Sequence, residues 1–290
     1  MESILIAHKK NILIKLLLLL FLFSACNKSK AEKKTCPNLF KAVLKGQLDT
    51  VKKLLNEDCD VNGKDDSGET PLLLAVENGH IAVINLLFDN GAQFADKGGN
   101  AELMTAAGNG DIEILKLLIK KGANLNSVNQ LEDTALIAAV ERDKYEIVRQ
   151  LILMGADINS KGNGGQTALM VSAGSGFMEI AKLLIEKSAE LNIKNNNGQT
   201  ALTSAAHNGR TELVALLAES GADINVAGND GNTAIMEAAE EGNTEVVKLL
   251  IKKEANLNAK DIYGQTALLR AEKRGNDYIV MLLKEAGANK

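Results

Sequence analysis

A five-residue segment, Gly-Gln-Thr-Ala-Leu, occurs three times in this chain of 290 residues, at 165–169, 198–202 and 264–268. Its Thr belongs to a series of equivalent positions that recur every 33 residues, with one shorter interval of 31 residues between Thr70 and Ala101. We expect the two missing residues within the loop 96–100. The series divides the chain into eight units, which start near residues 37, 70, 101, 134, 167, 200, 233 and 266. A period of this length indicates a repeat architecture, in which each unit packs mainly against its two neighbours.

Each unit predicts two short helices joined by a tight turn. In the sixth unit, apolar residues recur at helical spacing over 202–206 and again over 211–220. Thr200 precedes the first stretch, where its side chain can accept a backbone N–H. A turn residue, usually Gly, follows nine residues later and permits the positive φ that reverses the chain. The second stretch ends in Gly-Ala-Asp-Ile-Asn or a close variant, and a loop rich in Gly and Asn follows, with hairpin-turn chemistry.

A hairpin-like loop and two antiparallel helices every 33 residues resemble the ankyrin repeat. The resemblance covers nearly all of the chain after residue 36, and it implies an all-α repeat solenoid of about eight ankyrin repeats over residues 37–290. The family's Thr-Pro-Leu-His motif is only partly kept, because Thr70-Pro71-Leu72 retains the Pro but Leu73 stands in the place of the His. The His is absent from every unit, which implies that apolar packing replaces a polar contact between repeats.

Repeats three and four are the least regular, and the two end repeats are more polar than the others. Repeat three contains the short interval, and repeat four has Glu132 and Asp143 at positions where Gly is usual. We expect weaker stacking there, because the stability of a repeat protein is nearly a sum of unit and neighbour terms. Lys41 and Arg270 occupy a position that is mostly apolar or small in the internal repeats. This pattern predicts polar caps that keep the unpaired end faces soluble.

Residues 1–25 predict a signal peptide. Lys9, Lys10 and Lys15 form a basic region, and an apolar run of eight residues follows at 16–23, too short to span a bilayer comfortably. Leu-Phe-Ser-Ala-Cys at 22–26 resembles the lipobox of bacterial lipoproteins, with Phe23 where that family usually has Leu. The resemblance implies lipidation of Cys26 and a polar tether over 26–36, which would anchor the protein to the periplasmic or surface face of the bacterial cell envelope. An ordinary cleaved signal with a free Cys26 and an uncleaved N-terminal anchor remain open.

Two further cysteines lie in the first repeat. Cys36 directly precedes Pro37, and Cys59 replaces the Ala of Gly-Ala-Asp. In an ankyrin unit the first helix starts and the second helix ends at the same edge, so the resemblance implies that the two residues are neighbours. A disulfide is chemically permitted if this part of the chain is exported. Two unrelated small residues, with Cys59 filling an Ala-sized place, remain the alternative.

The composition argues against several other functions. Aromatic residues make up 3% of the chain, and the net charge of −4 gives no basic footprint for nucleic acid. His8, His80 and His207 have no Cys or carboxylate partner at metal-ligand spacing. The Ser and Cys residues lie outside catalytic motifs, and the Gly-rich loops lack the Lys-Ser/Thr of a phosphate loop. We therefore expect no enzymatic activity, no cofactor, no catalytic or metal site and no nucleic-acid partner, and we expect a monomer.

The ankyrin resemblance implies a protein partner that contacts the loop tips, called fingers below, and the exposed positions of the first helices, which together line a concave groove. By alignment, the groove residues are Asp66, Ser67, Glu69, Glu77, Asn78, Gln130, Leu131, Asp133, Glu141, Arg142, Asn196, Asn197, Gln199, His207, Asn208, Asn229, Asp230, Asn232, Glu240, Glu241, Ile262, Tyr263, Gln265, Lys273 and Arg274. Most are polar, as any solvated loop is. Ile262 and Tyr263 are typical of interface anchors, unless they pack on the neighbouring finger. Lys273 and Arg274 are expected to form a cationic rim.

We therefore expect a non-enzymatic protein-binding scaffold, exported and tethered to a membrane. Two other functions remain open: a structural or protective cell-envelope protein without a discrete ligand, and a secreted effector directed at a host cell. A lipidated Cys26 would argue against free release of an effector.

Overall fold

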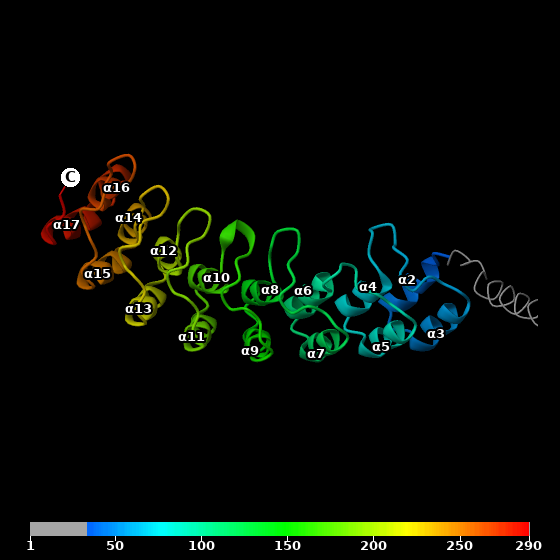
Figure 1. Cartoon of the computed structure of the whole chain (residues 1–290). Helices are drawn as coiled ribbons and strands as arrows, with labels where there is room; N and C mark the ends of the chain where they lie inside the picture. The colour runs from blue at the N-terminus through cyan, green and yellow to red at the C-terminus, as the bar shows by residue number, and fades with distance from the viewer. Residues whose placement is uncertain (1–33, 290) are drawn as a thin grey trace, which may run out of the picture.

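A computed structural model of the chain describes residues 34–289 as a curved stack of helix pairs. The described part contains sixteen α-helices in two rows, with the fingers along one edge (Figure 1). The inner row, beside the fingers, consists of α2 (Pro37–Leu44), α4 (Pro71–Glu77), α6 (Asn100–Asn109), α8 (Ala135–Glu141), α10 (Ala168–Ser175), α12 (Ala201–His207), α14 (Ala234–Glu240) and α16 (Ala267–Arg274). The outer row consists of α3 (Leu48–Asn56), α5 (Ile81–Asp89), α7 (Ile112–Lys120), α9 (Tyr145–Leu153), α11 (Met178–Glu186), α13 (Thr211–Glu219), α15 (Thr244–Lys252) and α17 (Asp277–Glu285). This architecture confirms the predicted all-α repeat solenoid.

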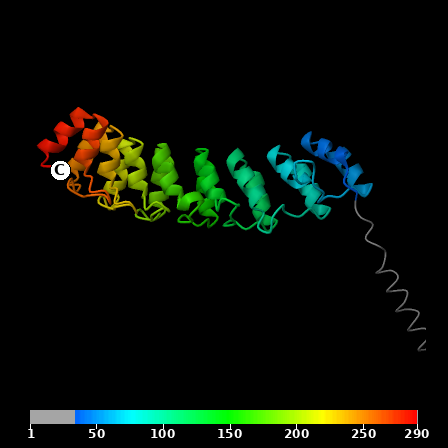
Figure 2. The same cartoon turned by 90° about the horizontal axis from the view of Figure 1, so that it is seen from above.

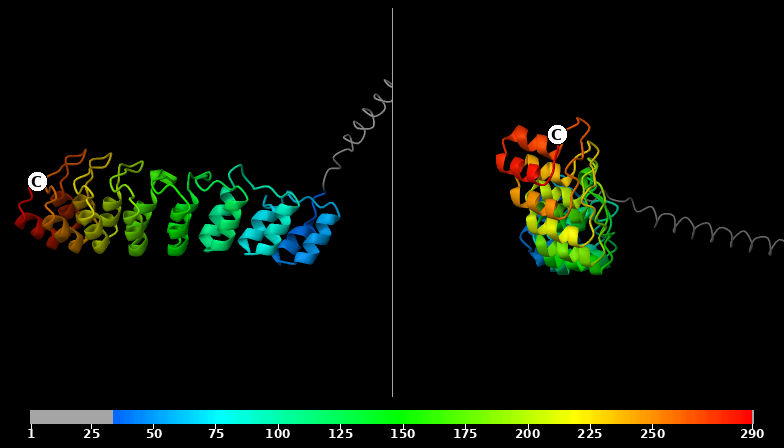
Figure 3. Two further views of the ribbon diagram at one scale, coloured as in Figure 1. Left: turned by 60° about the horizontal axis from the view of Figure 1, so that its bottom comes forward. Right: turned by 90° about the vertical axis from the view of Figure 1, so that its left-hand side faces the viewer.

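The helices contact one another in a regular order. Each inner helix packs against the next inner helix and against the outer helix of its own repeat. The outer helices also pack in order along the stack, except that α7 makes little contact with α5 and α9. Seen from above, the pairs follow one another along the stack (Figure 2). Two further views show the fingers projecting from the same side of the stack (Figure 3). A 3-10 turn, η1 (Asn163–Gly165), lies in the finger before α10. Below, the finger of a repeat is the loop that directly precedes its inner helix.

The hydrophobic core runs through the whole stack, because every repeat contributes apolar side chains at the same positions. In repeat six, Leu202, Ala205 and Ala206 of α12 and Val214 and Leu217 of α13 are fully buried. The small Ala side chains let neighbouring inner helices approach closely, and the larger side chains fill the space between the rows. Burying one side chain such as Val or Leu contributes about 1.5–3 kcal/mol. Most of this burial needs a neighbouring repeat.

The recurring Thr is the N-cap of the inner helices. Before α4, α8, α10, α12 and α16, its Oγ1 accepts the backbone N–H three residues later at 3.2–3.4 Å. Thr200 and Thr203 form a reciprocal capping box. Thr233 is an exception, because its buried Oγ1 has no hydrogen-bond partner in the described part of the chain. The repeated Thr therefore begins an inner helix, as the sequence predicts.

A second recurring contact joins each repeat to the next. The Asn that ends Gly-Ala-Asp-Ile-Asn accepts, through Oδ1, a backbone N–H 31 residues later: Asn192 binds Asp223 at 2.9 Å. The other rungs of this asparagine ladder are Asn62–Gln93, Asn126–Asp157, Asn159–Glu190, Asn225–Asn256 and Asn258–Asn289. Because a short amide side chain must meet one particular N–H, the ladder fixes the register between neighbouring repeats.

One rung of the asparagine ladder is absent because Ala95 stands at the ladder position, and the two missing residues lie elsewhere than expected. Asp96 accepts the N–H groups of Gly98 and Asn100. Asp65 accepts N–H groups at the same two spacings in the regular finger of repeat two. The turn 96–100 is therefore complete, and the two residues are missing between Ala95 and Asp96, where residues 63–64 stand in the regular finger of repeat two. The N–H of Asn124 donates instead to the carbonyl of Gly98 at 2.8 Å.

Glu102 holds this shortened stem. Its side chain is fully buried, and its Oε1 accepts the N–H of Ala95 at 2.9 Å. Its Oε2 has no hydrogen-bond partner among the described residues. Burial raises the pKa of Glu102 above its ordinary value, because a carboxylate loses solvation there. The shortened stem of repeat three is thus held by a buried carboxylate, which is energetically unfavourable.

Repeat four is irregular in its turns. Glu132 and Asp143 have φ values of 68° and 52°, in the left-handed region that the usual Gly adopts freely. For a residue with a Cβ this conformation costs roughly 1–2 kcal/mol. The irregularity of repeats three and four therefore consists of a lost ladder rung, two strained turns and weak contacts of the outer helix α7 with α5 and α9, which agrees with the expected weaker stacking.

We expect Asn192→Ala to lower the free energy of unfolding by about 1 kcal/mol, because the N–H of Asp223 loses its acceptor. Asn197→Ala is the matched control: Asn197 is an exposed finger residue, and its side chain makes no hydrogen bond within the described part. The control should change stability by less than about 0.5 kcal/mol. Urea unfolding followed by circular dichroism measures both changes. Equal losses in the two variants would contradict a role for the ladder.

Candidate functional site

The predicted groove residues lie on the fingers and near the C-terminal ends of the inner helices, and most of them are exposed. The exposed ones are Asp66, Ser67, Glu77, Asn78, Gln130, Leu131, Glu141, Arg142, Asn196, Asn197, His207, Asn208, Asn229, Glu241, Ile262, Tyr263, Lys273 and Arg274. The half-buried ones are Glu69, Gln199, Asp230, Asn232, Glu240 and Gln265. The remaining residue, Asp133, is buried.

Asp133 is therefore a correction to the predicted groove. It is 7% exposed, and its Oδ1 accepts the N–H of Asn163 at 2.8 Å. It links the finger of repeat four to that of repeat five instead of facing a partner. Backbone N–H groups continue the row at 2.9–3.0 Å, from Asn196 to Gly164, from Asn229 to Asn197 and from Ile262 to Asp230. The fingers of repeats four to eight thus form one connected surface.

An aspartate or asparagine at the first position holds most of the regular fingers. Asp261 accepts, through Oδ1, the N–H groups of Tyr263 and Gln265, both at 2.8 Å. Asp65, Asn129 and Asn195 make the equivalent pair of bonds. These bonds fix the backbone of the tip, so an exposed tip side chain loses less entropy when a partner binds it.

Arg270 lies at the centre of a polar network in the last two repeats. It is 8% exposed, and it reaches Glu240 at 2.9 Å and Asp261 at 2.6 Å. The prediction of a solvent-facing cap at this position is wrong, because the side chain turns back toward repeat seven. Arg274 also binds Glu240, at 2.5 Å. Glu240 therefore neutralises Arg274 of the expected cationic rim but not Lys273.

The network continues into repeat six. Nδ1 of His207 lies 2.9 Å from Oε2 of Glu237, and Oε1 of Glu237 accepts the side-chain amide of Asn232 at 2.9 Å. Asn232 also accepts a hydrogen bond from Arg270. Sequence reasoning missed Glu237 and this role of Asn232, because the chain of contacts crosses three repeats. The available signal was that Arg270 and Glu237 occupy the same position of neighbouring repeats with opposite charges.

A comparison with known protein families identifies the family of this chain. A family model described as ankyrin repeats (3 copies) matches residues 4–98, 94–162, 136–228 and 225–290. The chain belongs to the ankyrin-repeat family. Ankyrin repeats generally mediate protein–protein interactions, and the family is typically non-enzymatic. A comparison with curated proteins found no match.

The carboxylates of the ankyrin domain's C-terminal network have lowered pKa values. Burial alone would raise the pKa of Asp261, but hydrogen bonds from Arg270 and from two backbone N–H groups outweigh it, so the pKa falls below its ordinary value. Burial also acts to raise the pKa of Glu240, and the hydrogen bond from Arg274 and the charge of Arg270 lower it further than burial raises it. Both carboxylates are therefore held in the charged form.

A hollow interrupts the ankyrin finger row at repeat three. The tall fingers before α4 and α8 stand on either side of the low loop before α6 (Figure 1). Between them lies a hollow of about 790 Å³, lined in part by Leu73, Met104, Val128 and Leu131. We call it the repeat-three hollow. Sequence reasoning placed only Leu131 in the groove. Two features of the sequence could have identified the other lining residues: the short interval of 31 residues, and the presence of two apolar residues in the finger of repeat four.

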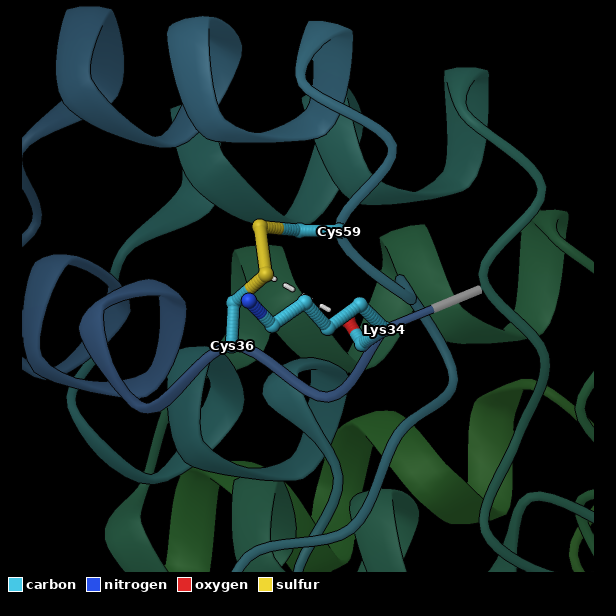
Figure 4. The surroundings of a disulfide bond; sticks show 3 residues. All are labelled: Lys34, Cys36 and Cys59. Atoms are coloured by element: carbon cyan, nitrogen blue, oxygen red, sulfur yellow. Dashed lines mark hydrogen bonds between the residues drawn. A yellow bond between two sulfur atoms is a disulfide. The ribbon is translucent and has the colours of Figure 1, made fainter. Parts of the chain in front are cut away.

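The first ankyrin repeat is closed covalently. Cys36, the N-cap of α2, and Cys59, which follows α3, form a disulfide with their Cα atoms 5.6 Å apart (Figure 4). Beside the disulfide, Lys34 and Cys59 pair in an isolated parallel bridge, and the N–H of Asp60 donates to the carbonyl of Lys34 at 3.0 Å. The segment before α2 is thus fixed to the loop after α3.

Two further searches concern residues 34–289 alone. No cluster of His, Cys, Asp and Glu in this range is arranged to hold a metal ion. None of the helices in the same range is long and apolar enough to cross a membrane. The predicted signal region 1–25 and Cys26 lie outside the described residues.

We expect Arg270→Ala to lower the free energy of unfolding at pH 7 by about 3 kcal/mol, because it leaves the buried carboxylate of Asp261 unpaired. The lowered pKa values of Asp261 and Glu240 mean that their contribution is present above about pH 4 and is lost as the pH falls through the folded-state values. The difference between wild type and variant should therefore shrink in acid. Denaturant unfolding at several pH values measures it.

The control for this prediction is the double variant Asp261→Asn with Arg270→Ala, which copies the pair Asn129 and Ala138 of repeat four. Asn129 makes the same finger bonds as Asp261, so the double variant should recover part of the loss. A double variant less stable than the single one would contradict this account.

Proposed function

We propose that this chain is an exported, lipid-anchored ankyrin-repeat protein that binds a protein partner through its concave face. The observation that carries the proposal is the finger tip of repeat eight, where Ile262 and Tyr263 are 66% and 77% exposed. Their backbone N–H groups donate to Asp230 and Asp261, so the backbone is held while both side chains remain in solvent. A solvent-exposed aromatic on a fixed loop is typical of a binding hot spot.

Two features support the exported, tethered part of the proposal. The sequence places a basic region and an apolar run of eight residues before Cys26, in a lipobox-like context. The disulfide between Cys36 and Cys59 belongs to an oxidising compartment, because cytosolic reductants keep thiols reduced. In this proposal residues 26–36 form the tether, and the repeats that follow extend away from the lipid.

We expect Cys26→Ser to abolish labelling by a fatty-acid probe and to leave an unprocessed precursor, because the thiol of Cys26 is the proposed lipid acceptor. Metabolic labelling and mass spectrometry of the mature N-terminus measure both effects. Cys59→Ser is the control and should keep the label. Thiol titration of exported wild type without reductant should find Cys36 and Cys59 unreactive. Normal labelling and size in Cys26→Ser would overturn lipidation.

We expect Tyr263→Ala to weaken binding of a captured partner about thirtyfold, the effect of losing a hot-spot side chain worth about 2 kcal/mol. The melting temperature should hardly change, because the side chain is 77% exposed. The full chain serves as bait in an envelope extract, and the affinity for the purified partner is then measured by surface plasmon resonance. Tyr278→Ala is the matched control, since Tyr278 is 51% exposed on the outer row. Equal weakening by both variants would contradict concave-face binding.

A further inference from the structure

The repeat-three hollow is the place where this domain departs most from a regular ankyrin stack. Two residues are missing from the finger stem before Asp96, and the loop before α6 lies lower than the fingers on either side of it (Figure 1). A hollow of about 790 Å³ is within the ordinary size range of binding pockets. It can take one or two large side chains of a partner.

The lining of the hollow is mainly apolar. Leu73 comes from α4, Met104 from α6, and Val128 and Leu131 from the finger of repeat four. Val128 and Leu131 are 50% and 58% exposed, and both belong to a finger whose tip is held by Asn129. The equivalent residues of repeat six are Lys194 and Asn197, on either side of Asn195. Apolar tip residues are therefore a local property of this finger and of the finger of repeat eight.

The rim of the hollow is acidic. A second hollow of about 380 Å³ adjoins the first, since Met104 and Thr105 line both, and Glu77 and Glu141 line it from α4 and α8. Burial, Glu69 and Asp65 together raise the pKa of Glu77. Burial and Asp133 raise the pKa of Glu141 despite the opposing effect of Arg142. A cation bound beside them would therefore stabilise the charged form of both carboxylates.

Three basic residues belong to the same region and do not cancel this charge. Lys97 lines the first hollow, Arg142 lines the second, and Lys64 is exposed on the finger of repeat two. The guanidinium of Arg142 lies against Gly108 of α6. The acidic residues of the lining and of the flanking fingers and helices outnumber them: Asp65, Asp66, Glu69, Glu77, Asp96, Glu132 and Glu141.

We infer that the repeat-three hollow is the specificity pocket of the concave face, and that it receives a large apolar side chain from a partner segment with Lys or Arg on both sides of that residue. The inference rests on the proposed function and adds the chemistry of the partner. The apolar lining selects the central side chain, and the acidic rim selects the flanking charges and speeds their encounter at low salt.

Other occupants match this chemistry less well. The chain's own segment 28–34 has four Lys residues, but its largest apolar side chain is that of Ala31, which leaves the hollow unfilled. A second copy of this chain would present fingers that are themselves mostly acidic or uncharged. Both occupants are outcomes that the test below distinguishes.

The test uses the full chain and short labelled peptides in fluorescence anisotropy. The main probe is Gly-Lys-Lys-Leu-Phe-Lys-Lys-Gly, and its two comparison peptides replace either the four Lys by Glu or the Leu-Phe pair by Ser-Ser. We expect the main probe to bind at least about tenfold more tightly than either comparison peptide, because both the apolar pair and the positive charges contribute. Its affinity should fall as the salt concentration rises.

Variants locate the binding. Leu131→Ser should weaken the main probe about tenfold without changing the melting temperature, since Leu131 is 58% exposed. The double variant Glu77→Gln with Glu141→Gln should weaken the probe and reduce its salt dependence. Leu153→Ser is the matched control, because Leu153 is an apolar residue of the outer row that is 62% exposed, and it should leave the affinity unchanged.

Four results would overturn the inference. The first is equal binding of the acidic peptide, and the second is equal weakening by Leu131→Ser and Leu153→Ser. The third is self-association in analytical ultracentrifugation that Leu131→Ser abolishes, which would assign the hollow to a second copy. Tighter peptide binding after removal of segment 28–34 would show competition by that segment, and it would support the inferred charge preference. The fourth is failure of the peptides to bind while a captured partner still depends on Tyr263, in which case the hollow is not the pocket and concave-face binding stands.

Discussion

The structure depends on burial that no repeat can complete alone. The helices are seven to ten residues long, too short to be stable in isolation, so their helicity comes from packing of an apolar face against a neighbour. The asparagine ladder adds direction to this burial, because each rung joins one side chain to one backbone N–H of the next repeat. Packing therefore supplies most of the stability, and the ladder fixes how one unit sits on the next.

The period and the capping Thr were readable from the sequence because they recur in register and act within a single unit. Thr200 caps its own helix whatever lies beside it. Arg270 and Asp133 were misassigned, because their partners lie one repeat away and a sequence does not say which neighbour a side chain turns toward. The sequence shows that one interval is two residues short, but the place where these residues are missing follows only from the hydrogen bonds of Asp96.

One deletion has two consequences for the concave face. The shortened stem brings Asp96 directly after Ala95, which has no side chain for a ladder rung, and it also lowers a finger at the repeat-three hollow. Beyond it, the fingers of repeats four to eight are joined by hydrogen bonds into one surface. The concave face thus divides into a continuous, mostly polar part and a recessed apolar part with acidic edges. Such a division lets a partner be selected in one place and held in another.

The disulfide of the first repeat also changes how the stack responds to mechanical load. A pull on the chain ahead of Cys36 reaches the start of α2 and, through the sulfur atoms, the end of α3 at the same moment. Peeling α2 away by itself is then geometrically blocked, since Cys59 must move with it. Tension is therefore shared across the full width of the first repeat, and unravelling from this end must displace two helices together before it can reach α4.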